Sequence, residues 1–498
     1  MLFLKRFFAI SFAFFVVNKI KRSFSKAPEL QKKTLKNLIK KSKNTSFGIE
    51  HKFHLIKNHE DFVRRVPVRD YEQIKKYIAR IKKGELNVLW PGKPKYLAKT
   101  SGTTSGIKQI PITNDSMPNH ILSARNALLF YIYETRKTKF LNGKTIFIQG
   151  TPTLRGINGI LEGRLSGIVA HHVPKYLRKN NLPTLKTNSI EDWELKVDQI
   201  CQETINENMT VIGGIPSWVQ MYFEKIKTKT NKSIIKVFPN FSLFIHGGVN
   251  FEPYKTMFKN MIGKTVDSIE LYPASEGFFA YQDNFNEDGL LLLLNSGIFY
   301  EFIDADKFFD DDAKRITIKD VKLGVNYVII LSTNAGLWSY NIGDTIRFVS
   351  TRPYRIVVTG RIKHFISAFG EHVIAKEVET ALKKVIDLTP IQIREFTVAP
   401  QVNPSSGLPY HEWLIDFKIP PKDINKFSDK LDYEMRNQNI YYEDLINGKV
   451  LRPLLVSIVE NNGFEAYMKR IGKLGGQNKV PRLSNNRKIA DNLKIKNE

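Results

Sequence analysis

The sequence predicts an α/β protein: a large N-terminal domain of mixed and parallel sheets flanked by helices, a β-rich part, and a small α+β domain at the C-terminus. Short apolar segments alternate with helical segments between residues 145 and 277, which is typical of parallel sheets covered by their connecting helices. Strand-like segments then follow without helices, and the pattern changes again after Arg361. With 498 residues, 42% of them hydrophobic, the chain has enough apolar side chains for two cores.

The expected elements follow in order along the chain. Residues 27–92 are predicted to be helical, because Leu35, Leu38 and Ile39 recur on one helix face. Strands are expected at 145–149, 209–212, 241–245 and 268–271, and a helix at 216–226. The β-rich part is expected to contain strands at 290–294, 327–331 and 354–358.

The C-terminal domain is predicted to comprise residues 363–498, so that the first domain comprises 1–362. A helix is expected at 377–385, strands at 393–399 and 412–419 on either side of a loop at 404–407, and a helix at 423–437. The mixture of hairpin and helices indicates an α+β domain.

Composition restricts the function. The formal net charge is +27, but the lysines are scattered and no basic stripe carries interleaved aromatic residues, so nucleic acid is not an expected partner. We expect most of this charge to be solvated and some of it to serve an anionic substrate. The single cysteine, Cys201, excludes an intramolecular disulfide, is expected to be a buried structural thiol, and suits a cytoplasmic protein.

The N-terminus carries an apolar run, residues 7–17, with cations on both sides. Eleven residues rise only about 17 Å as a helix, too little to span a bilayer. The flanking charges and the lack of a small-residue cleavage site disfavour a signal peptide. Two interpretations stay open: a helix docked on the main domain, or a basic, aromatic-rich helix through which residues 1–22 contact a membrane peripherally.

Three polar clusters follow predicted strands, where open α/β sheets bind ligands. Residues 100–108 are rich in hydroxyl groups and glycine and end in Lys108, with a spacing that matches neither a Walker A loop nor a dinucleotide fingerprint. The second cluster holds Tyr272 and Glu276, and the third holds Asp344. Together they offer donors for phosphates, a carboxylate for Mg²⁺, a flat face for adenine and an acceptor for ribose. Each residue alone is also explained as a loop, turn or core residue, so the prediction depends on their order and shared position.

These clusters resemble the nucleotide motifs of the acyl acid amido synthetases, the auxin-responsive promoter family of the acyl-adenylate-forming superfamily. The resembling motifs are Thr100 to Gly106 with Lys108, Tyr272 to Glu276, and Tyr340 to Asp344. Further short segments resemble the family at residues 45–48, 66–71, 297–302, 360–361, 369–371 and 479–482, so the resemblance runs nearly from end to end of the chain. The resemblance implies an adenylate-forming fold whose small C-terminal domain is mobile.

The resemblance also implies roles for individual residues. ATP would be held by Ser101, Gly102, Thr103, Thr104, Lys108, Gly247, Gly248, Val249, Tyr272, Ser275, Asp344 and Arg361. Among these, Tyr272 would pack on adenine and Asp344 would bind the ribose hydroxyls with help from Arg361. Glu276 would hold Mg²⁺, and Lys479 would act on the phosphates, with Lys488 as an alternative. Pro273 and Asn341 depart from the family pattern without removing any of these groups.

The resemblance implies ATP-dependent adenylation of a carboxylic acid, followed by acyl transfer to an amine, with an amino acid as the expected amine, and release of AMP and pyrophosphate. Acyl transfer to a thiol, as in acyl-CoA ligases, and a catalytically silent binding protein of the same fold are the alternatives. A zinc hydrolase built on His51, His54 and His59, or on His171 and His172, is disfavoured because no carboxylate partner is placed beside them.

Overall fold

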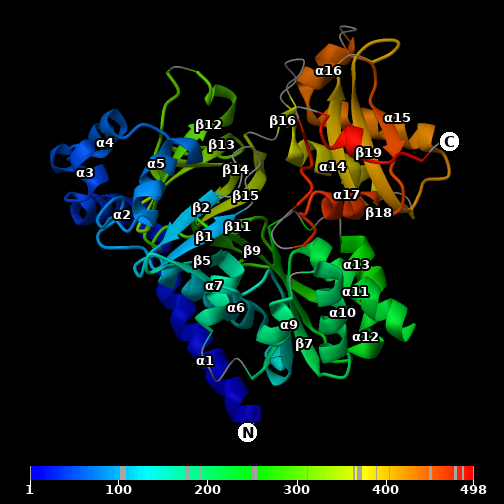
Figure 1. Ribbon diagram of the computed structural model, residues 1–498, viewed down its shortest axis with the longest axis horizontal. Coiled ribbons are helices and arrows are strands. Elements are labelled where there is room, and N and C mark those ends of the chain that lie inside the picture. The colour runs from blue at the N-terminus through cyan, green and yellow to red at the C-terminus, as the bar shows by residue number, and fades with distance from the viewer. Residues whose placement is uncertain are drawn as a thin grey trace. The chain divides into compact units, whose positions relative to one another are not determined.

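The computed structural model divides the chain into two compact units (Figure 1). It describes residues 2–100, 108–173, 179–190, 192–248, 251, 255–310, 312–362, 365–366, 373–387, 390–402, 404–447, 451–475, 479–484 and 487–496. The first unit is Met1–Phe251, Phe258–Ile342 and Ile346–Val357, and the second is Glu252–Met257, Gly343–Thr345 and Val358–Glu498. The expected boundary after residue 362 stays a prediction.

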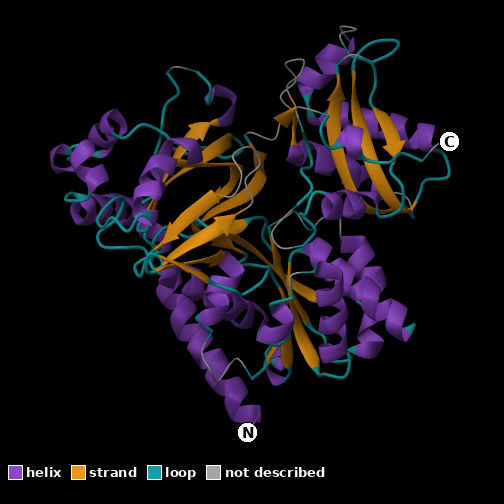
Figure 2. Ribbon diagram, viewed as in Figure 1, coloured by secondary structure: helices purple, strands orange, loops and turns teal. Residues whose placement is uncertain are grey.

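An eleven-stranded sheet forms the centre of the first unit (Figure 2). Its parallel half holds β6 (Asn181–Leu182), β3 (Lys144–Ile148), β7 (Met209–Gly214), β8 (Leu243–Gly247) and β9 (Asp267–Ala274), in that order. The remaining strands are β10 (Gly277–Tyr281), β11 (Leu290–Leu292), β15 (Tyr354–Arg361), β14 (Tyr340–Thr351), β13 (Asn326–Thr333) and β12 (Ile298–Asp304). Antiparallel pairing joins β9 to β10, β10 to β11, β11 to β15 and β12 to β13. The mixed α/β architecture is confirmed.

A second sheet of four strands brings together segments that the sequence did not identify as strands. Its order is β2 (Lys108–Ile112), β1 (Tyr96–Thr100), β5 (Ile160–Arg164) and β4 (Arg155–Ile157). The pair β1 and β2 is an antiparallel hairpin, whereas β1 and β5 run parallel. The carboxyl ends of β1 and β5 therefore lie at the same edge of this sheet.

Helices precede and interrupt the sheets. They are α2 (Ala27–Ser42), α3 (Ser46–Glu50), α4 (His59–Arg65), α5 (Tyr71–Lys82), α6 (Met117–Thr135), α7 (Leu165–His171), α10 (Trp193–Thr204), α11 (Pro216–Thr230) and α13 (Lys255–Ile262). The helical prediction for residues 27–92 is wrong beyond Lys82, because Gly84 adopts a φ of +94° and Pro91 follows. Cys201 is buried in α10, as expected, and burial raises its pKa to about 12.

The N-terminal helix α1 (Leu2–Lys21) is longer than the apolar run that predicts it. Lysine and arginine are good helix formers, so the cations at either end extend the helix instead of ending it. One side packs on α6, where Ala13 and Val17 are fully buried in the cluster that contains Phe130 (Figure 1). The docked interpretation is therefore confirmed. In the described chain, no helix has both the length and the apolar character needed to cross a bilayer.

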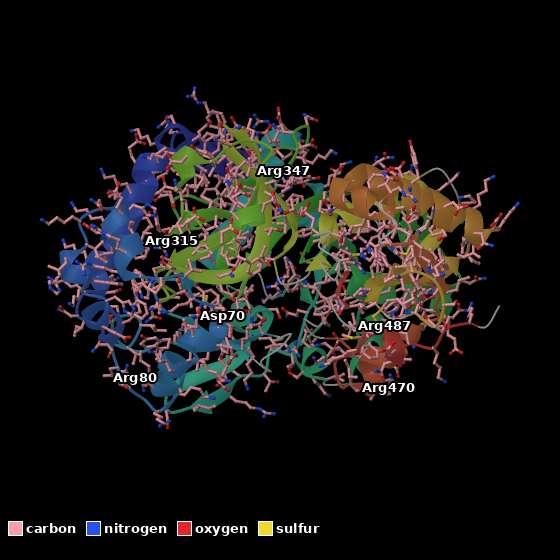
Figure 3. All side chains as sticks on the ribbon, turned by 90° about the horizontal axis from the view of Figure 1, so that it is seen from above. Asp70, Arg80, Arg315, Arg347, Arg470 and Arg487 are labelled. Atoms are coloured by element: carbon pink, nitrogen blue, oxygen red, sulfur yellow. The ribbon has the colours of Figure 1, made fainter. Side chains whose placement is uncertain are left out.

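A buried carboxylate, Glu301 on β12, connects the N-terminal helices to the central sheet. Its oxygens accept a hydrogen bond from Ser339 and lie 2.8 Å from Nε2 of His59 and 3.3 Å from Nε of Arg315, which is labelled in Figure 3. Arg315 also donates to the Val66 carbonyl. Because a buried carboxylate without partners is strongly destabilising, these contacts determine how the segments approach one another.

The second unit is an α+β structure. Its sheet has the order β18 (Gln392–Gln401), β19 (Tyr410–Ile419) and β20 (Leu455–Ile458). The helices α14 (Ala375–Ile386), α15 (Ile424–Gln438), α16 (Ile440–Asn447) and α17 (Gly463–Arg470) accompany it. Phe396 and Trp413 stack in its core with ring centroids 5.9 Å apart. Each helix and strand expected between residues 377 and 437 is present.

Candidate nucleotide and acyl site

The carboxyl ends of β8 and β9 form a close-packed edge in the first unit. Gly247 pairs with Leu271, and a Cβ at Gly247 would lie 2.3 Å from the Leu271 carbonyl oxygen, so only glycine fits. Gly248 follows with a φ of +83°, which also favours glycine. The predicted residues Gly247 and Gly248 thus expose backbone at the edge where parallel sheets bind ligands. Val249 lies outside the described residues.

The turn between β9 and β10 carries the second cluster. Ser275 and Glu276 form this two-residue turn, with Ser275 buried and Glu276 partly exposed. Asn119 of α6 secures β10, because its side chain accepts from the Phe278 N–H at 2.7 Å and donates to the Phe278 carbonyl at 3.0 Å. The amide therefore holds the strand that positions Glu276 at the carboxyl end of β9.

Tyr272 lies on β9 beside this turn. Its side chain is buried in the main core and meets Phe279 edge to face, with centroids 5.1 Å apart. The structure thus gives Tyr272 a packing role, and its expected contact with adenine stays a prediction.

The hydroxyl-rich loop closes the β1–β2 hairpin. Thr100 pairs with Lys108 across the hairpin, and Nζ of Lys108 lies 5.9 Å from the Tyr71 ring centroid. The Tyr71 hydroxyl accepts a hydrogen bond from the Gln109 N–H at 2.9 Å, which anchors the second strand. The predicted phosphate-binding residues Ser101, Gly102, Thr103 and Thr104 lie outside the described residues.

Asp344 and Arg361 meet in the second unit. Nε of Arg361 lies 2.8 Å from Oδ1 of Asp344, and the carboxylate side chain is largely buried. Gly343, with a φ of +87°, accepts a hydrogen bond from the Ile362 N–H at 2.7 Å. This ion pair orients the carboxylate, and the expected binding of ribose by Asp344 with help from Arg361 stays a prediction.

The start of the third cluster is hydrogen-bonded to the backbone of Arg69, which lies far away in sequence. The Arg69 N–H donates to the Ser339 carbonyl, and the Asn341 N–H donates to the Arg69 carbonyl at 2.8 Å. Asp70 then caps α5 by accepting from the Gln73 N–H (Figure 3). Residues 66–71 therefore support the strand that leads to Asp344.

Lys479 lies near the Asp344–Arg361 pair in the same unit. Its segment is secured along β18, because Val398 donates to the Arg482 carbonyl at 2.9 Å and accepts from the Ser484 N–H at 3.0 Å. Desolvation by the surrounding protein lowers the pKa of Lys479 to about 8; Asp344 opposes this shift, and Arg361 and Arg482 add to it. The side chain keeps an exposed surface, so water moderates the shift. Asp344 is the anion among the charges that act on Lys479. The choice of Lys479 over Lys488 stays a prediction.

Arg164 is a half-buried cation that the sequence did not single out. Arg164 is the last residue of β5 and pairs with Lys99 near the end of β1. Its side chain lies against Gly150, just beyond β3, because a Cβ added to Gly150 would be 2.6 Å from Cδ of Arg164. Desolvation alone lowers its pKa, and no described carboxylate pairs with it. A half-buried guanidinium without an anion attracts an anionic ligand. The sequence signal was weak, because Arg164 lies outside the three polar clusters that predicted the site.

Comparison with family models decides the classification. Residues 16–158 and 160–266 match the GH3 family N-terminal domain, 291–361 match the central domain, and 374–488 match the C-terminal domain. These matches cover most of the chain in the expected order. The chain belongs to the GH3 family.

Relatives and solved structures agree with the GH3 assignment. The chain is 23% identical to the indole-3-acetic acid-amido synthetase GH3.15 of Arabidopsis thaliana, over 86% of this chain and 85% of that protein. It is 21% identical to the jasmonoyl–L-amino acid synthetase JAR6 of Nicotiana attenuata, over 92% and 91%. The solved GH3.15 acyl acid amido synthetase superposes with a TM-score of 0.78 at 14% identity, covering 96% of both chains. A 2-hydroxyisobutyryl-CoA ligase in the postadenylation state shares the fold at a TM-score of 0.57 and 12% identity, covering 95% of this chain and 89% of the ligase.

The donor set of this GH3 chain suits a magnesium ion that arrives with a nucleotide. Within the described ranges, no group of three or more His, Cys, Asp or Glu side chains is placed to hold a metal on protein ligands alone. Mg²⁺ typically uses one or two carboxylates together with substrate phosphates, and Glu276 offers one partly exposed carboxylate at the strand edge. The residues present therefore fit Mg²⁺ bound through Glu276.

Of the histidines named for a zinc hydrolase, His54 is exposed and the other four have separate partners. His51 donates to the Phe47 carbonyl, and His59 contacts Glu301. His171 donates to the Pro152 carbonyl, and His172 lies 3.0 Å from the Tyr96 hydroxyl. These contacts are explained by structural roles.

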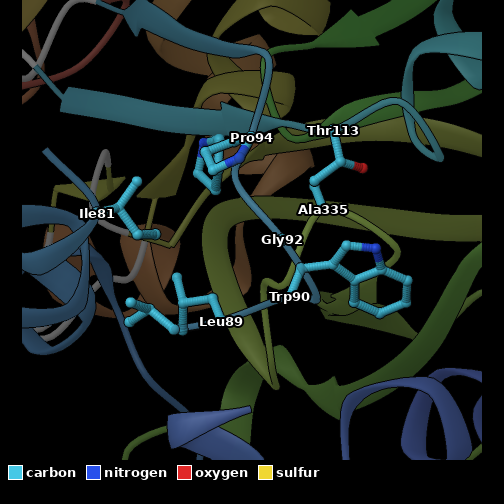
Figure 4. A pocket seen from close by; sticks show the side chains of 9 residues that line it. Ile81, Leu89, Trp90, Gly92, Pro94, Thr113 and Ala335 are labelled. Carbon is cyan, nitrogen blue, oxygen red and sulfur yellow. The ribbon is translucent and has the colours of Figure 1, made fainter. Parts of the chain in front are cut away.

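A small apolar pocket is lined by residues that do not belong to the predicted site (Figure 4). Trp90, Leu89, Ile81 and Ala335 are among the side chains that line it, and its volume is about 10 Å³. A cavity of that size holds about one water molecule. It therefore does not accommodate a nucleotide or an acyl substrate.

The lack of space at Gly247 leads to the first prediction. Gly247→Ala should separate β8 from β9, lowering both the melting temperature and the affinity for ATP measured by calorimetry, because the added carbon collides with backbone that cannot rotate away. Gly156→Ala is the matched control, since nothing lies within 4 Å of a Cβ there. Unchanged melting and ATP binding in Gly247→Ala would contradict this account of the edge.

Proposed function

We propose that this GH3 protein is an acyl acid amido synthetase, which uses ATP to join a carboxylic acid to the amino group of an amino acid. The observation that carries the proposal is the edge at the carboxyl ends of two neighbouring parallel strands, where Gly247 ends β8, Gly248 follows it, and Glu276 lies in the turn after β9. The matching N-terminal, central and C-terminal family models support it, as do the activities named for the plant relatives.

The proposed reaction has two balanced steps. An oxygen of the acid's carboxylate attacks the α-phosphorus of ATP, a new P–O bond forms, and pyrophosphate leaves with its bridging oxygen. The amine nitrogen then attacks the acyl carbon, the C–O bond to the phosphate breaks, AMP leaves, and the nitrogen loses a proton to give the amide. No protein nucleophile is required, so the residues act by positioning the substrates and by stabilising charge.

Residues of this chain have defined roles in the proposal. The loop from Ser101 to Lys108 binds the phosphates through Ser101, Gly102, Thr103, Thr104 and Lys108. Gly247, Gly248, Val249 and Tyr272 form the adenine site, and Ser275 supports the turn. Asp344, oriented by Arg361, accepts the ribose hydroxyls. Glu276 holds Mg²⁺, which when bound neutralises phosphate charge.

Two cations meet the anionic substrates. Lys479 stabilises the negative charge that develops on the phosphates during adenylation. Arg164 holds the acid's carboxylate before the attack, which meets its need for an anion. Because two anions must approach each other in the first step, both positive charges lower the repulsion between them.

Loss of either assigned carboxylate should stop the first step. Asp344→Ala and Glu276→Ala should each lower acid-dependent ATP–pyrophosphate exchange by about 100-fold or more, since each removes a group that holds the nucleotide or its metal. Melting temperatures near the wild-type value should show that both variants are folded. Asp429→Ala, which removes an exposed carboxylate on α15, is the control and should keep full exchange. Full exchange in either site variant would refute its assignment.

Lys479 should give the reaction a pH limit. Its lowered pKa means that the ammonium is present below that pKa and is lost above it, so exchange should decline with rising pH before a fully solvated lysine would lose its proton. Lys479→Arg should move this decline to higher pH, because arginine stays protonated, and Lys479→Gln should lose activity at every pH. Lys488→Gln should keep the wild-type profile. A profile unchanged in Lys479→Arg would exclude Lys479 as the titrating group.

Arg164 should determine the affinity for the acid. Arg164→Gln should raise the KM for the acid about tenfold or more in the exchange assay and leave the KM for ATP unchanged, since a charge-assisted bond is lost. Arg155→Gln, at an exposed arginine on β4, is the matched control. A rise in the KM for ATP alone would place Arg164 at the phosphates instead.

The acceptor is identified by the mass of the product. A screen of acids by exchange, followed by mass spectrometry with amino acids and with coenzyme A in parallel, separates amide formation from thioester formation. A thioester without amide would overturn the proposal, and a silent exchange assay over a broad acid panel would favour a binding protein.

A further inference from the structure

The helix α1 has two opposite apolar faces, of which one is used inside the fold. Successive residues are about 100° apart around a helix. On that spacing Ala13 and Val17 share one face, and both are fully buried against α6. The packing of the first unit therefore accounts for one side of α1.

The opposite face presents a row of exposed phenylalanines. Their exposed fractions are 59% for Phe7, 66% for Phe8, 48% for Phe12, 53% for Phe14 and 68% for Phe15. At 100° per residue these five rings cover about half of the circumference of α1, with Phe8 and Phe15 on the side opposite Ala13 and Val17 and with Phe12 and Phe14 beside α6. Single exposed apolar residues are ordinary, but five exposed aromatic rings on one helix form an apolar patch. Phe7 and Phe8 contact each other edge to face, and Phe14 stacks on Tyr133 of α6, so the patch extends to the neighbouring helix.

Positive charge borders this patch. Lys5 and Arg6 lie at one end of α1 and Lys19, Lys21 and Arg22 at the other, and α1 contains no acidic residue. The guanidinium of Arg125 lies 5.8 Å from the Phe12 ring centroid. Glu134 is the nearby carboxylate among the described contacts of α1, and it is paired with Lys21 at 2.9 Å. Apolar rings bordered by cations are complementary to an anionic phospholipid surface, which offers acyl chains below negative headgroups.

We propose that α1 binds peripherally to an anionic membrane. The helix lies in the plane of the headgroups, its phenylalanines enter the acyl boundary, and its lysines and arginines contact lipid phosphates. The helix α1 is not long and apolar enough to cross a membrane, since cations lie on both sides of its eleven-residue apolar run. Pairing with a second copy of the chain would oppose two sets of the same cations, which is unfavourable. The proposal is independent of the catalytic residues.

The test uses the full chain and vesicles of known composition. Wild-type protein should sediment with vesicles of phosphatidylcholine and phosphatidylserine in equal amounts, and much less with phosphatidylcholine alone. The triple variant F7S/F8S/F15S should reduce the partition coefficient by about 100-fold or more, because three large apolar side chains no longer leave water. Phe309→Ser is the matched control, since Phe309 is 66% exposed and lies outside α1.

A charge variant tests the role of the cations, and activity and melting measurements test whether each variant is folded. Lys19→Ser with Arg22→Ser should weaken binding to the anionic vesicles and reduce its dependence on salt. Exchange activity and melting temperature should stay unchanged in all these variants, which shows that each is folded. The proposal is overturned by equal sedimentation of wild type and triple variant, by equal binding to both vesicle types, or by light scattering that shows a wild-type dimer which the triple variant abolishes.

Discussion

The pairing of one buried carboxylate, Glu301, is the interaction on which much of the first unit depends. His59, Arg315 and Ser339 approach it from three parts of the chain, and each must be correctly placed for the charge to be compensated. Ser339 lies directly before β14, the strand that leads to Asp344. The hydrogen bond between Ser339 and Glu301 therefore also holds the residue from which β14 starts.

The sequence predicted the strands that end in glycine better than it predicted the contacts around them. β7 and β8 were expected because apolar runs stop at Gly213 and Gly247, a signal carried by neighbouring residues. Asn119 and Arg164 were not assigned because their meaning depends on Phe278 and Gly150, which lie far away in sequence. The hairpin of β1 and β2 was not predicted because β2 contains Pro111, which disfavours a strand except at the edge of a sheet, and β2 is such an edge strand.

The proposed site uses few protein charges for a reaction between anions. Glu276 is the proposed carboxylate for the metal, and the described residues contain no larger cluster of acidic or histidine ligands. Such a site acquires its full charge balance when the nucleotide arrives. Before substrates bind, no described carboxylate pairs with Arg164, so its positive charge can attract an anion.

The close approach of Gly150 and Arg164 has a consequence for the proposed acid site. Because a methyl group at position 150 would lie 2.6 Å from Cδ of Arg164, the arginine stem occupies space that glycine alone leaves open. Any larger residue at position 150 must displace the arginine stem, even where the arginine itself is retained. The position of the proposed acid-binding cation is therefore set by a residue that carries no functional group.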